Sequence, residues 1–262
     1  MNPDSHPDKS KSGAAVVGEE ISRAFTGTGL VLDRISFQIR PGEFVALLGP
    51  SGSGKSSLLR LIAGLDQADG GRLAIEAVNG ALSRGFVFQE PTLMPWRTVL
   101  RNTTLPLELE GWSRDDAKAR AEEELRRVRL AEFGARYPHE LSGGMKMRTS
   151  VARALTTRPN LLLLDEPFAA LDEPTRHGLQ IQLREIWTAL RMTVLFVTHS
   201  VMEAVFLADR IIVLSHRPAQ IVLDESITTL PPIRSTALRT SIEYMNEVRR
   251  ISDAVPAVTE AL

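Results

Sequence analysis

The chain has 262 residues, of which 43% are hydrophobic and 24% charged, the balance of a globular protein with one large domain or two small ones. Lys and Arg number 31 against 32 Asp and Glu, so no basic excess favours nucleic-acid binding. Cysteine is absent, which excludes disulfides and thiol chemistry and is compatible with a cytosolic protein.

The first 18 residues are rich in Pro, Ser, Asp and Lys and lack the apolar core of a signal peptide, so we expect a disordered tail over residues 1–18. No apolar run approaches the roughly 20 residues of a membrane-spanning helix. We therefore expect a cytoplasmic protein that reaches a membrane only through a partner.

Alternating apolar residues over 16–39 predict two short strands around a turn at residues 26–29. Residues 73–77 predict a further strand of the same small β subdomain. Phe25 is an isolated aromatic just before the turn, for which core packing is the simpler interpretation and stacking on a nucleotide base the alternative.

A phosphate-binding motif lies between a predicted buried strand (44–48) and a predicted helix (57–63). Its eight residues fit G-x-x-x-x-G-K-[ST]: Gly49, Pro50, Ser51, Gly52, Ser53, Gly54, Lys55 and Ser56. The glycines let backbone N–H groups converge on an anion at the helix N-terminus. Ser57, which follows Ser56 in the first turn of this helix, is also expected to bind the nucleotide. We expect Lys55 to reach the β- and γ-phosphates and Ser56 to ligate Mg²⁺.

Residues 85–89 predict an apolar strand that ends in Gln89, whose side-chain oxygen can ligate a metal or position a water. The next apolar cluster, 93–96, contains Pro95, so we expect no regular structure there. Trp96 is interpreted either as a buried side chain or as an aromatic that binds a partner.

Residues 99–132 are predicted to be helical, with Ser113 and Asp116 at the spacing of a capping box. The helix over 114–129 is heavily charged, and we expect a solvated face with i,i+4 ion pairs. A second helix is expected from about residue 145 to 157.

The start of that second helix carries three residues that could bind an anion. Ser142 is a suitable N-cap, and Gly143 and Gly144 would expose backbone N–H groups. A plain helix start explains the same residues, so this segment alone does not establish a site.

Two further apolar strands end in polar side chains. Asp165 and Glu166 follow the strand 161–164, and His199 follows the strand 193–198. Ligands of open α/β sheets bind at this end of the strands. We expect Asp165 to hold the Mg²⁺ shell and Glu166 to polarise an attacking water, while the position of His199 favours a catalytic role over a structural one.

Taken in this order, the motifs closely resemble the ATP-binding subunits of ATP-binding cassette (ABC) transporters, over roughly residues 21–223. The resemblance implies an α/β P-loop NTPase fold of the ABC-cassette type, with a mixed β core containing a parallel sheet, an antiparallel β subdomain and an α-helical signature subdomain. It implies an ATP-binding domain over residues 19–240, within which the helical subdomain spans about 92–155. A C-terminal helical extension follows over residues 241–262.

The resemblance also implies roles for individual residues. Glu166 matches the catalytic carboxylate, His199 the switch histidine and Gln89 the Q-loop glutamine, which would act in catalysis and as a metal ligand with Ser56 and Asp165. Phe25 falls where the family places the aromatic that stacks on adenine, and Asp172 matches the D-loop residue that couples two sites.

Ser142, Gly143 and Gly144 match the signature sequence, which in this family covers the ATP held by a second copy. Met145 stands where the family more often has Gln, and Lys146-Met147-Arg148 replaces a commoner Gln-Gln-Arg. We still expect an active ATPase, because the Ser-Gly-Gly core is intact.

The resemblance implies ATP and Mg²⁺ as cofactors and a homodimer that sandwiches two ATP molecules. It further implies permease subunits docked near residues 89–96, an indirect periplasmic solute-binding protein, no nucleic acid, and a peripheral position at the cytoplasmic face of the inner membrane. The segments 89–96 and 198–204 look like the nitrate, sulfonate and taurine branch of bacterial importers. A pyrimidine precursor is an alternative cargo.

Two other classes of function are alternatives to a transporter subunit. A soluble cassette ATPase that acts on DNA or ribosomes usually carries two cassettes or a long coiled-coil insertion, neither of which this sequence shows. A phosphate-loop kinase would not need the Ser142–Gly143–Gly144 segment or Gln89.

Overall fold

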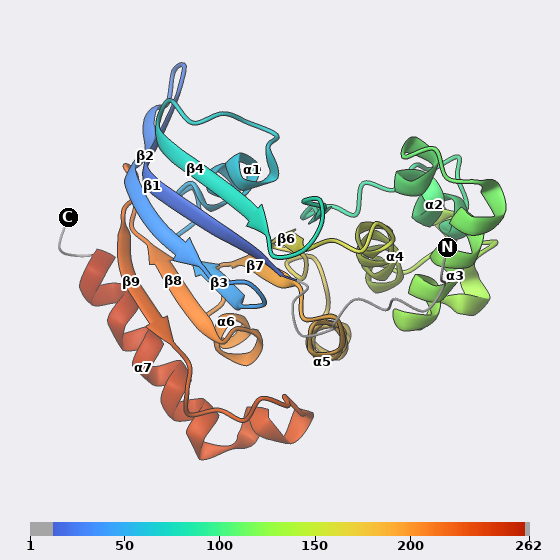
Figure 1. The fold of residues 1–262 in the computed structure, drawn as a ribbon. Coiled ribbons are helices and arrows are strands. Elements are labelled where there is room, and N and C mark those ends of the chain that lie inside the picture. The colour runs from blue at the N-terminus through green and yellow to red at the C-terminus, as the bar shows by residue number, and fades with distance from the viewer. Residues whose placement is uncertain (1–12, 260–262) are drawn as a thin grey trace.

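The computed structural model describes residues 13–259 and contains two β-sheets with a helical subdomain beside them (Figure 1). A three-stranded antiparallel sheet has the order β2-β1-β4, and a six-stranded sheet the order β5-β6-β7-β3-β8-β9. The strands are β1 (Ala14–Phe25), β2 (Gly29–Ile39), β3 (Phe44–Leu48), β4 (Gly70–Ala77), β5 (Arg84–Val87), β6 (Leu161–Asp165), β7 (Thr193–Thr198), β8 (Arg210–Leu214) and β9 (Ile221–Ser226).

The six-stranded sheet is parallel except for β9, which runs antiparallel to β8. Its central strands are buried on both faces, which explains their unbroken apolar runs. In β3, Val45 and Leu47 join the core shared with helix α1 (Lys55–Ala63) and the antiparallel sheet, whereas Phe44 and Ala46 join the core on the other face.

The register of this sheet aligns the three polar strand ends. Leu48 pairs with Thr198, and Asp165 pairs with Val197. The phosphate loop (residues 49–56), Glu166 and His199 therefore leave the sheet at one edge. This arrangement confirms the expected α/β class with an antiparallel subdomain.

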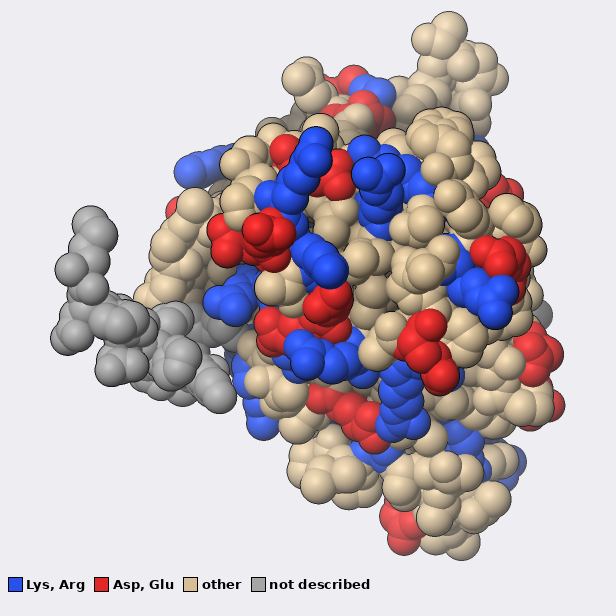
Figure 2. Space-filling model, turned by 90° about the vertical axis from the view of Figure 1, so that its right-hand side faces the viewer, with Lys and Arg blue, Asp and Glu red and all other residues tan. Residues whose placement is uncertain are grey.

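The helical subdomain consists of α2 (Val99–Leu109), α3 (Arg114–Arg127) and α4 (Gly143–Leu155), which pack against one another. The Ser113 hydroxyl accepts a hydrogen bond from the Asp116 N–H, which confirms the predicted helix start. Figure 2 shows the face on this side of the molecule, where acidic and basic side chains intermingle.

The expectation that the charged helix presents only a solvated face is wrong. The side chain of Glu124 is fully buried and that of Arg120 nearly so, and the two lie 2.7 Å apart. Arg120 also donates hydrogen bonds to the carbonyls of Leu155 and Thr156 at the end of α4. The pair is buried because Arg120 satisfies carbonyls that a helix C-terminus leaves unpaired.

The predicted tail is also too long. Strand β1 begins at Ala14, where Ala14 and Val16 are fully buried and the Ala14 N–H donates to Thr193 Oγ1 at 2.9 Å. Both residues pair with β4, so this part of the chain is a strand of the antiparallel sheet and not a disordered tail. β1 and β2 are long strands of 12 and 11 residues rather than short ones. Residues 1–12 lie outside the described residues.

The remaining helices are α5 (Glu173–Leu190), α6 (Val201–Leu207) and α7 (Ile242–Thr259). The last lies within the segment 241–262, expected to be a helical extension, and it packs against α6 and β9 (Figure 1). Short 3₁₀ turns occur at Ala131–Phe133, Pro138–Glu140 and Thr236–Thr240. Among the helices within residues 13–259, none is long and apolar enough to cross a membrane.

Candidate active site

Within the phosphate loop, Gly54 is the N-cap of α1 and has a left-handed φ of 98°. A Cβ atom there would lie 2.8 Å from Leu32 Cδ2 and 2.9 Å from Val31 Cγ1, so only glycine fits. No side chain of the described residues caps this helix N-terminus. Its N–H groups therefore remain suited to an anion.

Lys55 lies inside the loop and is 4% exposed. Its Nζ donates to the carbonyls of Gly49 at 3.0 Å and Pro50 at 2.8 Å. Burial lowers the pKa of Lys55, while the nearby carboxylates of Glu166 and Asp165 act in the opposite direction. The ammonium is thus already held where the loop would receive a phosphate.

Ser56 and Asp165 form a pair of oxygen donors between α1 and β6. Ser56 Oγ donates to Asp165 Oδ1 at 2.8 Å. Burial raises the pKa of Asp165, although the Ser56 hydrogen bond favours its ionised form. A hydroxyl and a carboxylate in contact are the hard oxygen ligands that suit Mg²⁺, so the donor set fits this ion. Gln89 is exposed two residues beyond Val87, which pairs with Leu164 at the same sheet edge.

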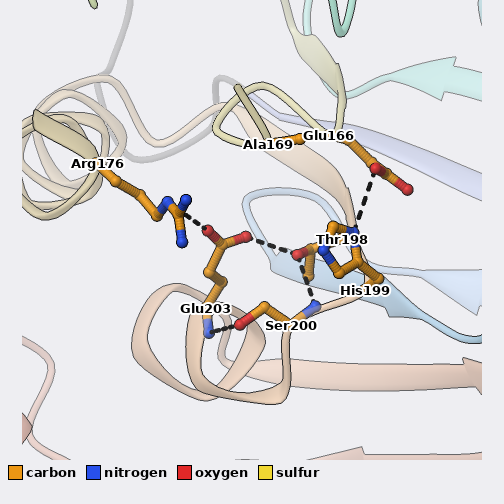
Figure 3. Close-up of a pocket in the computed structure, with 7 residues that line it drawn as sticks. All are labelled: Glu166, Ala169, Arg176, Thr198, His199, Ser200 and Glu203. Carbon is orange, nitrogen blue, oxygen red and sulfur yellow. Dashed lines mark hydrogen bonds and ion pairs between the residues drawn. The ribbon is translucent and has the colours of Figure 1, made fainter. Parts of the chain in front are cut away.

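Glu166 and His199 come together across two neighbouring strands. His199 Nδ1 lies 3.3 Å from Glu166 Oε2. Glu166 has a left-handed φ of 44°, a strained conformation held in place by its N–H bond to the Val197 carbonyl. Both side chains border a pocket of about 40 Å³ (Figure 3). That volume holds about two or three water molecules rather than a nucleotide.

Phe25 lies at the end of β1 and is 36% exposed, so the core-packing interpretation is wrong. The guanidinium of Arg23 lies 4.6 Å from the ring centroid. Asp66 and Asp69 hold Arg23 through ion pairs of 2.8 and 2.9 Å. The ring is therefore positioned at the surface by a charged neighbour.

The segment 142–144 begins α4 in the helical subdomain. Ser142 accepts a hydrogen bond from the Met145 N–H, while Gly143 is exposed. A Cβ on Gly144 would lie 2.4 Å from Thr175 Cγ2, so glycine permits close packing of α4 on α5. Asp172 caps α5 through the Thr175 N–H. Within residues 13–259 no hydrogen bond joins this segment to the phosphate loop of the same chain.

Several polar residues behind the site were missed by sequence reasoning. Glu203, Thr198 and Arg176 line the same pocket as Glu166 and His199. The one available signal was the spacing of Ser200 and Glu203, which is that of a capping box before a helix. The contacts of the Glu203 carboxylate come from two other elements, β7 and α5, and could not be read from that spacing.

Comparisons with known proteins agree on one family. The family model described as ABC transporter matches residues 32–169. The chain is 45% identical over 208 residues to an aliphatic sulfonates import ATP-binding protein, SsuB, of Bacillus cereus, covering 77% of this chain and 82% of that protein. It is 40% identical over 230 residues to a taurine import ATP-binding protein, TauB, of Rhizobium johnstonii, covering 87% and 88%.

A third relative is an uncharacterised ABC transporter ATP-binding protein of Methanocaldococcus jannaschii, 44% identical over 239 residues, or 89% of this chain and 88% of that protein. Among solved structures, the ATP-binding cassette MJ0796, a dimer in a post-hydrolysis state bound to ADP and Pi, superposes with a TM-score of 0.71. It is 30% identical, and the match covers 82% of this chain and all of that one.

Proposed function

Because the chain belongs to the ABC transporter family and is an ATPase of that family, we propose that it energises the import of a small solute through a separate membrane permease. The observation that carries this proposal is the similarity to two import subunits along most of the chain, one for sulfonates and one for taurine.

ATP is the nucleotide of this family. In the proposed complex, the phosphate loop and Lys55 hold its phosphates, and the exposed Phe25 ring stacks on the adenine. The N–H groups of residues 142–144 of a second copy cover the γ-phosphate from the other side. The separation of these two anion sites within one chain supports a homodimer, in which an isolated monomer binds ATP but hydrolyses it poorly.

Hydrolysis in this proposal takes place at the sheet edge. Glu166 accepts a proton from the attacking water and orients it, and His199 holds the γ-phosphate in line. Ser56, Asp165 and Gln89 are the residues that would hold Mg²⁺, which when bound offsets phosphate charge. Asp172 couples the two sites across the dimer.

Docking of the permease is assigned to residues 89–96. Trp96 is 74% exposed, so the buried interpretation of this side chain is wrong. The buried Asn102 pins the segment by exchanging hydrogen bonds with the backbone of Met94 at 2.8 and 3.1 Å. Arg153 on α4 bonds the carbonyls of Pro91 and Thr92. A rigid segment that presents an aromatic and contacts α4 suits a joint between site and partner.

We assign the cargo to the nitrate, sulfonate and taurine group, with a pyrimidine precursor as the alternative. A periplasmic binding protein would deliver it, and the chain would lie at the cytoplasmic face of the inner membrane. The rival function is a soluble ABC ATPase that acts on nucleic acid or ribosomes. The intermingled charges of the face in Figure 2 give that rival no basic patch there.

The proposal is tested by purifying tagged chain from detergent-solubilised cells and identifying what accompanies it. We expect a polytopic membrane protein, lost on Trp96→Ala and retained on Trp112→Ala, a matched control because Trp112 is also an exposed Trp, at 46%. Recovery of ribosomes or nucleic acid instead would overturn the transport function. A ligand screen on the solute-binding protein encoded beside the permease would then identify the cargo.

A further inference from the structure

The turn that carries His199 is held by a hydroxyl with two hydrogen bonds. Thr198 Oγ1 accepts from the Ser200 N–H at 3.0 Å and donates to Glu203 Oε2 at 2.6 Å (Figure 3). Because a hydroxyl has one proton, an acceptor at Glu203 fixes which way the Thr198 lone pairs point. The backbone on both sides of His199 therefore depends on the carboxylate of Glu203.

This differs from an ordinary capping box. In that motif the third helical residue accepts directly from the N-cap N–H. Here Ser200 is the N-cap and accepts from the Glu203 N–H at 3.3 Å, but its own N–H goes to Thr198. The Glu203 carboxylate is thus linked to the Ser200 N–H through the Thr198 hydroxyl. We call these two hydrogen bonds the relay, and His199 lies between the two residues, Thr198 and Ser200, that it connects.

Glu203 is itself fixed by residues of α5. Its carboxylate is 12% exposed, and Oε1 accepts from Gln180 Nε2 at 3.1 Å and lies 3.7 Å from Arg176 Nε. Burial raises its pKa, which the Thr198 hydrogen bond and Arg176 oppose. A buried carboxylate is costly unless paired, so these contacts hold it in one position.

The chain of contacts continues into the C-terminal segment. The buried Gln180 accepts a short hydrogen bond from Arg239, in the 3₁₀ turn Thr236–Thr240. The Arg239 guanidinium lies 3.6 Å from the centroid of Phe206 on α6. Tyr244 on α7 donates to the Met202 carbonyl, also on α6, at 2.9 Å. The C-terminal segment (residues 236–259) therefore contacts α6, the helix after His199, and also Gln180, which donates to Glu203.

We propose that Glu203 is a positioning residue that orients His199 through Thr198. We further propose that Arg239 connects the C-terminal segment to Glu203 through Gln180. The inference rests on the proposed role of His199 in ATP hydrolysis. It assigns to the C-terminal segment an effect on turnover rather than on nucleotide binding, because the phosphate loop takes no part in the relay.

The first test separates binding from turnover in the full chain. Thr198→Val removes the hydroxyl at nearly constant volume, and we expect kcat to fall about tenfold while KM for ATP changes less than about twofold. Thr198→Ser keeps the hydroxyl and should restore kcat. A rise in KM for ATP that accompanies the fall in kcat, or a Thr198→Ser variant that does not restore kcat, would contradict the proposed role of the relay. Thermal unfolding of each variant identifies a folding defect.

The second test asks whether the effect passes through His199. In a His199→Ala background, Thr198→Val should change the residual kcat by less than about twofold, since coupled residues are not additive. An additive tenfold loss would overturn the inference. If His199→Ala leaves turnover unchanged, the proposed function of His199 fails instead, and the two failures are distinguishable.

A readout that needs no turnover is the imidazole ¹H–¹⁵N spectrum, with the His199 signals assigned from His199→Ala. Thr198→Val and Glu203→Ala should both shift or broaden these signals, whereas Thr198→Ser and Glu203→Gln, which keeps an acceptor oxygen, should stay close to the parent spectrum. His139 serves as the internal control in the helical subdomain. Unshifted His199 signals in Thr198→Val would refute the positioning role.

The test of Arg239 has a matched control. Arg239→Met should lower kcat about threefold with KM for ATP unchanged, the scale of coupling between separated sites. Arg249→Met on the neighbouring helix should have no effect, because Arg249 is 83% exposed and its ion pair within residues 13–259 is with Asp253, one turn away. Equal effects of the two substitutions would contradict the link to Arg239.

Discussion

His199 Nδ1 lies 3.3 Å from Glu166 Oε2, so a side-chain contact joins the ends of β7 and β6. The backbone of Glu166 is held by a hydrogen bond from its N–H to the carbonyl of Val197, on the strand that precedes His199. The two groups that we propose act on the attacking water and the γ-phosphate are thus positioned by adjacent strands.

Replacing Glu166 with Gln should separate binding from chemistry. The amide keeps the size of the side chain but cannot accept a proton from water, so we expect kcat to fall about 10²–10⁴-fold. ATP affinity, measured by calorimetry, should stay within about twofold of the parent. Glu173→Gln is the control, since that carboxylate lies at the start of α5 and is 78% exposed. Normal turnover by Glu166→Gln would mean that another group activates the water.

Much of this site could be predicted from the sequence because its determinants are local. The apolar strand, the glycines of the loop and the helix after it lie within residues 44–63, and the structure places them as expected. Glu166 and His199 could be placed at one edge because parallel strands end together. No distance between them follows from the sequence, since β6 and β7 are separated by the whole of α5.

What could not be predicted depends on partners far along the chain. The burial of Arg120 requires the carbonyl of Leu155, 35 residues away. Ala14 is buried because it meets Thr193, 179 residues away. The role inferred for Glu203 depends on Gln180, 23 residues before it. Composition and periodicity depend on a residue and its near neighbours in the sequence. The burial and contacts of Arg120, Ala14 and Glu203 depend instead on residues that the fold brings into contact with them.

Lys55→Ala should weaken nucleotide binding directly. The ammonium is aimed into the loop and makes charge-assisted contacts, and loss of such a contact costs about 1.5–3 kcal/mol, or roughly 10- to 150-fold in Kd. Calorimetry with ATP measures this change. Lys146→Ala, on the first turn of α4 in the same chain, should leave the affinity of the monomer unchanged. An unaltered Kd for Lys55→Ala would refute the phosphate-loop assignment.

Asp165→Asn should stabilise the empty protein while impairing it. Burial raises the pKa of Asp165, so the folded state favours the protonated form and the ionised carboxylate costs stability at neutral pH. This cost appears as pH rises from the unfolded pKa, about 3.9, through the higher folded pKa. We therefore expect a higher unfolding temperature for the variant at pH 7 in EDTA, with the difference vanishing below about pH 4.

The same variant should gain less thermal stability than the parent when Mg²⁺ and ATP are added, because one metal ligand has lost its charge. Calorimetric scans with and without Mg²⁺-ATP measure both effects. A lower unfolding temperature of the empty variant would contradict the argument from burial.

The buried ion pair in α3 should contribute far more to stability than its exposed neighbours. Arg120→Met removes the 2.7 Å partner of the fully buried Glu124 and leaves it paired with Arg127 at 3.1 Å, so we expect a loss of about 3 kcal/mol in the free energy of unfolding. Lys118→Met removes an exposed pair with Glu122 at 3.8 Å and should cost less than about 1 kcal/mol. Denaturant unfolding of both variants provides the comparison, and equal losses would mean that burial does not decide the effect.

In the proposed dimer, each phosphate loop needs residues 142–144 of a second copy. Sedimentation of the Glu166→Gln variant with Mg²⁺-ATP tests this requirement, because slow hydrolysis preserves the ATP-bound state. We predict a dimer with ATP, a monomer without it, and an ATP-bound monomer when Ser142→Arg is added. A monomer at every concentration of ATP-bound Glu166→Gln, or a dimer that Ser142→Arg leaves intact, would contradict the shared site.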